Sequence, residues 1–218
     1  MQKLRSVIFD MDGTLLDSMG MWRSLDRRFL LENGVEPPDN ISEIMKSLTI
    51  ESSSRYLAET FHLPMTPEQV QVRVEQLAAD AYRYELPLKD GAAAFLAALS
   101  AKGIPCAIAS VTYRSLLEAA LERLQVAQYF RVILTAEQGM PGKHSPEIYL
   151  AAAKALGTAP EETVVIEDTL YAAKTAADAG FYTIGFRDAA DAADWPLLEK
   201  VCRCTVGSWH ELTDAGLF

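Results

Sequence analysis

A short apolar run that ends in two closely spaced aspartates constrains this chain more than any other stretch. Residues 4–9 are mostly apolar and β-prone, which is typical of a strand buried on both faces of a parallel sheet. Asp10 and Asp12 follow this strand, and Gly13 allows a tight turn. Open parallel sheets bind ligands beyond the carboxyl ends of their strands, so we expect both carboxylates at an active site. A divalent cation would relieve their mutual repulsion.

The composition indicates a soluble globular protein with a full hydrophobic core. The chain has 218 residues, of which 50% are hydrophobic, and this length corresponds to one or two domains. Thirty acidic and twenty basic residues give a net charge of −10, which argues against a nucleic-acid partner, because nucleic-acid phosphates require a basic face. We find neither a signal-like start nor an apolar run of the about 18 residues that span a membrane. We therefore expect a cytoplasmic protein without a membrane partner.

Hydrophobic periodicity predicts a helical insert within an alternating core. Residues 17–87 show helical spacing without a convincing strand, whereas strands and helices alternate after them. This alternation predicts an α/β fold, a doubly wound parallel sheet with helices on both faces. We assign residues 1–16 and 88–218 to this core and residues 17–87 to a helical domain inserted after the first strand. The later strands are expected at residues 104–110, 132–134, 163–166 and 182–186.

Polar side chains that suit phosphate chemistry follow the later core strands. Ser110 and the backbone of Val111 lie where a strand opens into a helix, a position that favours phosphate oxygens, although Ser and Thr are also ordinary helix caps. Lys143 lies in a loop held by Gly and Pro just before a helix, where a solvated surface lysine is the alternative. Glu167 and Asp168 form a second acidic pair after an apolar strand. Two acidic pairs at one sheet edge predict an oxygen site for a hard cation such as Mg²⁺.

The order and spacing of these motifs resemble the haloacid dehalogenase-like superfamily. The run from Asp10 to Thr14, Asp-Met-Asp-Gly-Thr, is similar to the DxDGT signature of that family, and a strand-end Ser, a Lys before Pro and an acidic pair follow in the family's order. The resemblance covers nearly the whole chain and is closest to the phosphatase and β-phosphoglucomutase-like branch with a helical cap. Two positions depart from that branch: Ala172 replaces a usual Gly, and Trp22 replaces the cap His of β-phosphoglucomutases.

The resemblance implies a Mg²⁺-dependent phosphatase that acts on a small phosphorylated metabolite, such as a sugar phosphate or a nucleotide. Asp10 would be the nucleophile that forms an aspartyl-phosphate, and Asp12 the general acid and base. Lys143 would join them in catalysis and, together with Ser110 and Val111, hold phosphate oxygens. The implied metal ligands are Asp10, the Asp12 backbone carbonyl, Asp168 and, through water, Glu167. The cap would exclude water and select the substrate, and a monomer is sufficient for this mechanism.

Two other functions stay open at this point. A phosphosugar mutase needs a bisphosphate intermediate and a cap group that stabilises it, and Trp22 at the cap His position argues against this activity. Trp22 itself fits either core packing or a pocket wall. A receiver-like phospho-signalling module also combines a phosphorylated Asp, an acidic metal site, a hydroxyl and a Lys, but the helical insert and Asp12 disfavour it. A dehalogenase is disfavoured because that branch lacks an acid at the position of Asp12.

Overall fold

The chain forms two compact units. The structure, a computed structural model, shows one unit made of Met1–Asp17 and Leu86–Phe218, here called the core unit, and a second made of Ser18–Glu85, the helical unit. No helix in the described part of the chain is long and apolar enough to cross a membrane. The residues that the structure describes are 4–46, 48, 50–137 and 141–214.

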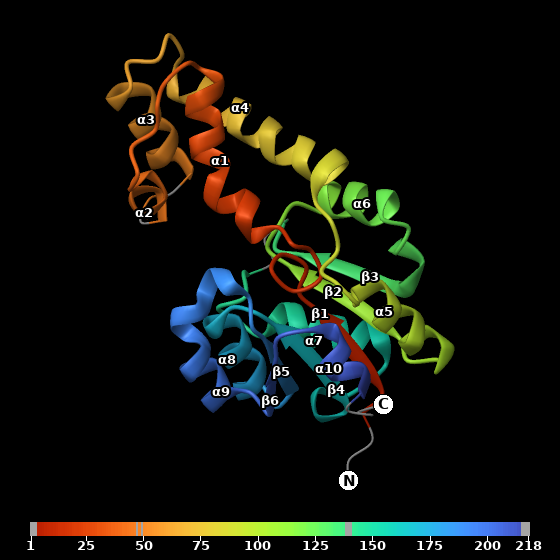
Figure 1. Ribbon diagram of the computed structural model, residues 1–218. Coiled ribbons are helices and arrows are strands. Elements are labelled where there is room, and N and C mark those ends of the chain that lie inside the picture. The colour runs from red at the N-terminus through yellow and green to blue at the C-terminus, as the bar shows by residue number, and fades with distance from the viewer. Residues whose placement is uncertain (1–3, 47, 49, 138–140, 215–218) are drawn as a thin grey trace. The chain divides into compact units, whose positions relative to one another are not determined.

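A parallel sheet of six strands forms the centre of the core unit, in the order β3-β2-β1-β4-β5-β6 (Figure 1). The strands are β1 (Ser6–Phe9), β2 (Cys106–Ser110), β3 (Phe130–Thr135), β4 (Thr163–Glu167), β5 (Tyr182–Phe186) and β6 (Cys204–Val206). The buried strand β1 lies between β2 and β4, with Val7 opposite both Cys106 and Val164. The chain therefore reverses its direction across the sheet next to β1, which is where open α/β sheets bind ligands. The predicted fold class is confirmed.

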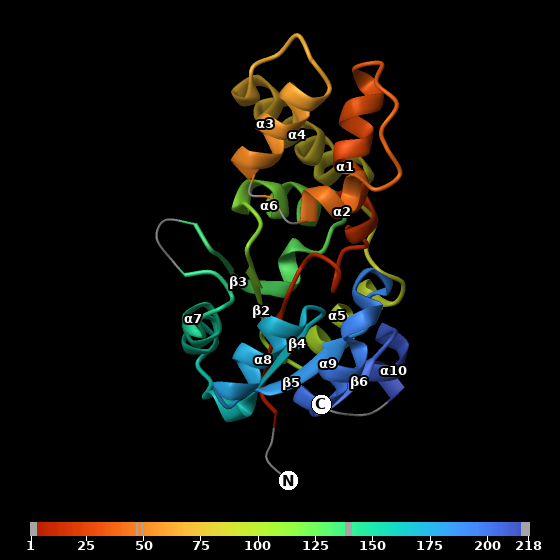
Figure 2. The ribbon, with the colours of Figure 1, turned by 90° about the vertical axis from the view of Figure 1, so that its left-hand side faces the viewer.

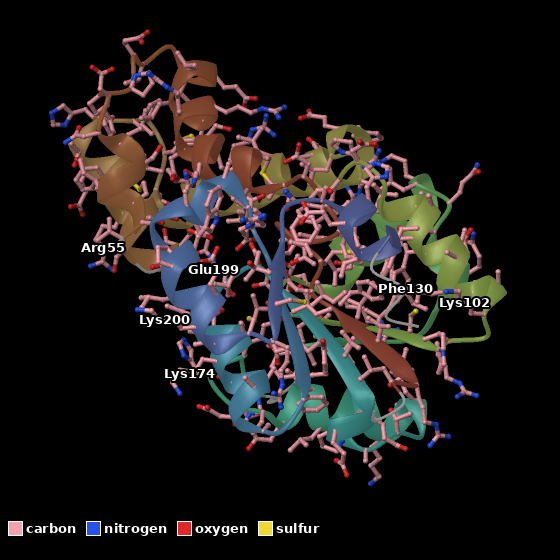
Figure 3. All side chains as sticks on the ribbon, turned by 60° about the horizontal axis from the view of Figure 1, so that its bottom comes forward. Arg55, Lys102, Phe130, Lys174, Glu199 and Lys200 are labelled. Carbon is pink, nitrogen blue, oxygen red and sulfur yellow. The ribbon has the colours of Figure 1, made fainter. Side chains whose placement is uncertain are left out.

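Helices cover both faces of this sheet. On one face, α7 (Glu147–Leu156) and α8 (Leu170–Asp178) pack against Ile8 and its neighbours. Helix α9 (Trp195–Val201) packs against α8 through Ala173 and Leu198. The sides of these two helices that face away from the contact carry charged side chains, which point outward (Figure 3): Lys174, Glu199 and Lys200. The remaining core helices are α5 (Ala92–Ala101), α6 (Arg114–Arg123), α10 (Trp209–Asp214) and the short 3₁₀ helices η2 (Ala127–Tyr129), η3 (Pro160–Glu162) and η4 (Ala189–Asp194).

An aromatic cluster on the other face connects β1 to α5 and α10. The ring of Phe9 lies with its centroid 6.3 Å from Phe95, 6.0 Å from Phe130 and 5.7 Å from Trp209. Trp209 also packs against Phe186 of β5, with centroids 4.9 Å apart. Aromatic rings at such separations gain stabilisation beyond the area that they bury. Because Phe9 directly precedes the first aspartate, this cluster fixes the strand end that carries the site.

The helical unit consists of α1 (Met19–Glu32), α2 (Ile41–Lys46), α3 (Ile50–Thr60), α4 (Pro67–Asp80) and the π-helical turn η1 (Ala81–Glu85). Helices α1 and α4 run side by side (Figures 1 and 2), and they bury Leu25, Phe29 and Val70 in a common core. A capping box stabilises the start of α4, because the side chains of Thr66 and Gln69 each accept a hydrogen bond from the backbone N–H of the other residue.

Several elements differ from the sequence expectations. The first strand begins at Ser6 rather than residue 4, and β3 is longer than the expected 132–134. Four elements were not predicted from the sequence: α2, α9, β6 and α10. These are short elements, and β6 has only one buried residue, Val206, so the sequence offers no apolar run there for periodicity to detect.

Replacing Trp209 tests the aromatic cluster. Trp209 is fully buried, so Trp209→Ala should lower the free energy of unfolding by about 3–5 kcal/mol, the usual cost of deleting a large buried aromatic side chain. Urea unfolding followed by circular dichroism measures this change. The control is Leu197→Ala on α9, whose side chain is 47% exposed; it should change the unfolding free energy by less than about 0.5 kcal/mol. Equal effects of the two substitutions would contradict this assignment of the core.

Candidate active site

The carboxyl ends of three adjacent strands bring the predicted acidic and hydroxyl residues to one edge of the sheet. Ser110 ends β2, Asp10 follows β1, and Glu167 ends β4. The backbone N–H of Asp10 donates to the carbonyl of Ile166 over 3.0 Å, which continues the pairing of β1 with β4 by one residue. Ser110 is anchored similarly, because its carbonyl accepts from the N–H of Ala136. The backbone of the sheet therefore sets the spacing of these side chains.

Lys143 lies at the centre of a buried charge cluster. Its Nζ donates to Oδ1 of Asp10 and, over 2.7 Å, lies against Oε1 of Glu167. Tyr149 of α7 donates from its hydroxyl to the same Glu167 oxygen over 2.7 Å. The Lys143 side chain is 3% exposed, so the alternative of a solvated surface lysine is wrong. Residues 138–140, which precede Lys143 in the sequence, lie outside the described residues.

Burial and mutual repulsion determine the protonation of this cluster. Burial is the largest cause that raises the pKa of Asp10 to about 7; Lys143 lowers that pKa, and Glu167 and Asp12 raise it. Burial, and then the charges of Asp10 and Glu167, hold the pKa of Asp168 well above its ordinary value. Burial lowers the pKa of Lys143, but Asp10 and Glu167 outweigh that effect and leave the pKa above its usual range. Lys143 therefore stays charged. Its single positive charge does not balance the carboxyl groups of Asp10, Glu167 and Asp168.

The buried carboxylates fit a hard divalent cation such as Mg²⁺. One oxygen each of Asp10, Glu167 and Asp168 lie within 4.8 Å of one another. Among the described residues, Glu167 Oε2 and Asp168 Oδ2 are buried without a hydrogen-bond partner. A buried polar atom without a partner destabilises the fold by about 1–3 kcal/mol, and carboxylate oxygens are the ligands that Mg²⁺ and Ca²⁺ prefer. A bound cation would satisfy both atoms and balance the excess negative charge.

Asp12 is held by a turn and by a hydroxyl group. Gly13 has φ +77°, a left-handed conformation that glycine adopts without steric cost, and its N–H donates to the carbonyl of Leu16 over 3.1 Å. The Asp12 side chain is half-buried, and its Oδ2 accepts a 2.7 Å hydrogen bond from Oγ1 of Thr112. The turn fixes the backbone of Asp12, and Thr112 fixes its carboxylate.

Two residues of the site were not predicted from the sequence, Thr112 and Tyr149. Thr112 follows Ser110 and Val111 in the segment that leads into a helix, and Tyr149 is a buried core residue of α7. The Val111 side chain is 53% exposed, and its backbone role in phosphate binding stays a prediction. Trp22 belongs to the helical unit, where its Nε1 donates to the hydroxyl of Tyr82 over 3.1 Å and the two rings pack edge to face. Its effect on substrate choice also stays a prediction.

Comparison with known proteins finds similar sequences over most of the chain. A family model described as a haloacid dehalogenase-like hydrolase matches residues 4–180. Hexitol phosphatase A of Escherichia coli (strain K12) is 30% identical over 190 residues, 87% of this chain and 86% of that protein. A phosphorylated carbohydrates phosphatase of Thermotoga maritima is 29% identical over 182 residues, 83% of this chain and 84% of that protein. A solved structure from Thermotoga maritima, provisionally named β-phosphoglucomutase, has a TM-score of 0.84 at 26% identity and covers 97% of this chain and 98% of its own.

The excess negative charge predicts that Asp168→Asn stabilises the protein in EDTA and removes its response to Mg²⁺. Between pH 3.8 and about 7 the folded state keeps a proton on Asp10 that the unfolded chain has released, so the free energy of unfolding falls as pH rises through this range. The raised pKa of Asp168 acts in the same direction. At pH 7 we expect Asp168→Asn to raise the free energy of unfolding by about 1 kcal/mol, the scale of an unpartnered buried group, with a smaller gain at pH 4.

Thermal unfolding in EDTA and in Mg²⁺ measures both effects. Mg²⁺ should raise the Tm of the unsubstituted protein, because a ligand that binds only the folded state stabilises it, and it should leave the Tm of Asp168→Asn nearly unchanged. The control is Asp178→Asn, which removes an exposed charge that pairs with Lys174 on α8; it should behave as the unsubstituted protein. An undiminished Mg²⁺ response in Asp168→Asn would show that the cation binds elsewhere.

Proposed function

Because this chain belongs to the haloacid dehalogenase-like hydrolases, we propose that it cleaves the phosphate monoester of a small metabolite through a covalent intermediate on Asp10. The observation that carries this proposal is the buried contact of Lys143 with Asp10 and Glu167, beside Asp168. It combines a carboxylate nucleophile, a fixed positive charge and a cation site in one place. The names of the hexitol and carbohydrate phosphatases support a phosphorylated carbohydrate as the substrate class, with a nucleotide as the alternative.

In the first step an oxygen of Asp10 attacks phosphorus in line with the leaving group. A bond forms between that oxygen and phosphorus while the bond from phosphorus to the ester oxygen breaks, which splits hydrolysis into two easier displacements. Lys143 holds Oδ1 of Asp10 and thereby orients the carboxylate, and its charge offsets that of the phosphate oxygens. Ser110 and the backbone of Val111 complete the proposed set of phosphate contacts.

Asp12 moves the protons in both steps. As the ester bond breaks, Asp12 gives a proton to the leaving oxygen, which departs as an alcohol. In the second step Asp12 takes a proton from water, the water oxygen attacks phosphorus, and the bond to Asp10 breaks to release inorganic phosphate. Such general acid and base catalysis contributes about 10²–10⁴ in rate.

Magnesium is the cofactor that we propose for this site. Asp10, the backbone carbonyl of Asp12 and Asp168 would hold Mg²⁺, with Glu167 acting through water. When bound, Mg²⁺ would offset the negative charge of the nucleophile and the phosphate. The acidic residues and their unpartnered oxygen atoms support this assignment.

The helical unit is proposed to select the substrate, as its resemblance to a cap domain implies. A phosphosugar mutase is the second candidate, and it is favoured by the structural similarity to the provisionally named β-phosphoglucomutase. Trp22 stands where a mutase would have a His, which favours hydrolysis. Activity that depends on an added sugar bisphosphate would identify a mutase, whereas a phosphatase releases inorganic phosphate from a panel of phosphate esters without such an activator.

Asp10→Asn tests the proposed nucleophile. The amide neither attacks phosphorus nor contributes charge to the cation site, so turnover should fall to background. Release of inorganic phosphate from the best substrate of a phosphate-ester panel measures this loss. The matched control is again Asp178→Asn, which should retain full activity. Measurable steady-state hydrolysis by a contaminant-free Asp10→Asn protein would refute the role of Asp10.

Asp12→Asn should separate the two half-reactions. Loss of the acid and base should slow steady-state hydrolysis about 10²–10⁴-fold, which corresponds to roughly 3–5 kcal/mol of activation free energy. Dinitrophenyl phosphate has a leaving group that needs no proton, so it should restore only the first step, and the aspartyl-phosphate should accumulate. Acid quench and mass spectrometry detect this intermediate as a phosphate mass on Asp10. If hydrolysis is unchanged in this variant, Asp12 is structural and the proposed mechanism is wrong.

A further inference from the structure

Thr112 connects the loop after β2 with the loop after β1. Its backbone N–H donates to Oγ of Ser110 over 3.1 Å, and its hydroxyl donates to Oδ2 of Asp12 over 2.7 Å. The neighbouring side chains Val111 and Tyr113 are 53% and 54% exposed, whereas Thr112 is half-buried. Thr112 is thus the residue of this loop that is turned toward Asp12, and it contacts both a proposed phosphate ligand and the proposed acid and base.

The hydroxyl of Thr112 does not cap the helix that follows it. A Thr just before a helix commonly accepts a hydrogen bond from the backbone of the first turn. Here α6 begins at Arg114, its N-cap Tyr113 makes no side-chain cap bond, and the backbone N–H of Arg114 donates to Oε2 of Glu137. The Thr112 hydroxyl instead acts as a donor, and Oδ2 of Asp12 accepts its hydrogen bond. The Thr112 hydroxyl therefore holds the Asp12 carboxylate and does not cap the helix.

A hydrogen bond to one carboxylate oxygen sets the plane of the whole carboxyl group. The turn at Gly13 already holds the backbone of Asp12, so the remaining freedom is rotation of its side chain. Proton transfer requires the carboxyl group within hydrogen-bond reach of the leaving oxygen and later of the water. A misplacement of about 1 Å can lower the rate 10²-fold. The Thr112 hydroxyl restricts this rotation without adding a charge.

We propose that Thr112 is the positioning residue of the general acid and base Asp12 and couples its orientation to the phosphate ligand Ser110. This inference rests on the proposed function. It predicts that Thr112 acts on the rate of proton transfer and not on substrate binding, and that the hydroxyl rather than the methyl group of Thr112 carries the effect.

A double-mutant cycle tests this inference. Thr112→Val replaces the hydroxyl by a methyl group of similar size, and Thr112→Ser retains the hydroxyl. With p-nitrophenyl phosphate and Mg²⁺ we expect Thr112→Val to lower kcat about 10–100-fold, since hydrogen bonds to charged groups are among the stronger ones, with KM within about twofold. Thr112→Ser should keep kcat within about threefold. In the Asp12→Asn background, Thr112→Val should have almost no further effect on kcat, because residues that act together are not additive.

The control is Thr175→Val on α8, where the hydroxyl donates to the carbonyl of Tyr171; its kcat should be unchanged. Thermal unfolding confirms that each variant is folded. Equal losses in both backgrounds, a higher KM at constant kcat, or equal losses for Thr112→Val and Thr112→Ser would each overturn the positioning role. Full activity of Asp12→Asn alone would instead refute the proposed function, and this inference with it. A slow Asp12→Asn together with a fully active Thr112→Val would refute only this inference.

Discussion

One ammonium group, Nζ of Lys143, holds the acidic side chains of this site together. Removing a charged group from water destabilises the fold strongly unless other charges and hydrogen bonds compensate. Lys143 meets this condition because it contacts both Asp10 and Glu167, and Glu167 accepts a further bond from Tyr149. Without the lysine, two buried carboxylates would face each other uncompensated. The position of α7, which carries Tyr149 and begins just after Lys143, therefore depends on the same charges as the site.

The two faces of the sheet contribute differently to this edge. On one face, α7 supplies the tyrosine that orients Glu167, and Lys143 comes from the loop before that helix. On the other face, the aromatic cluster around Phe9 fixes the strand that ends one residue before Asp10. The strand order places β1 between β2 and β4, so both sets of contacts act on neighbouring strand ends. The packed core thereby holds the strand ends that carry the proposed reactive groups.

The sequence predicted the elements whose apolar patterns are long and whose polar residues follow directly. Asp10, Ser110, Glu167 and Asp168 each stand at the end of an apolar strand, and the parallel topology brings such ends together. Tyr149 and Thr112 were not predicted, because their hydrogen-bond partners depend on where α7 and the loop after β2 lie in three dimensions. The same holds for β6 and α10: Trp209 stands in a six-residue helix, and only the tertiary structure shows that its ring packs on Phe9.

Stability and function place opposite demands on the carboxylates at this edge. Asp10 and Asp168 have raised pKa values, chiefly because burial disfavours their charged forms, and Asp168 and Glu167 each keep one oxygen without a partner among the described residues. A chain selected for stability alone would replace such groups with apolar ones. Asp12 differs, since a hydroxyl from its own chain satisfies one of its oxygens. A group that binds a cation benefits from unpartnered oxygens, whereas a group that transfers protons must keep one orientation before and after each transfer. The chain therefore leaves its proposed cation ligands incompletely paired and fixes the orientation of the carboxylate proposed to move the protons.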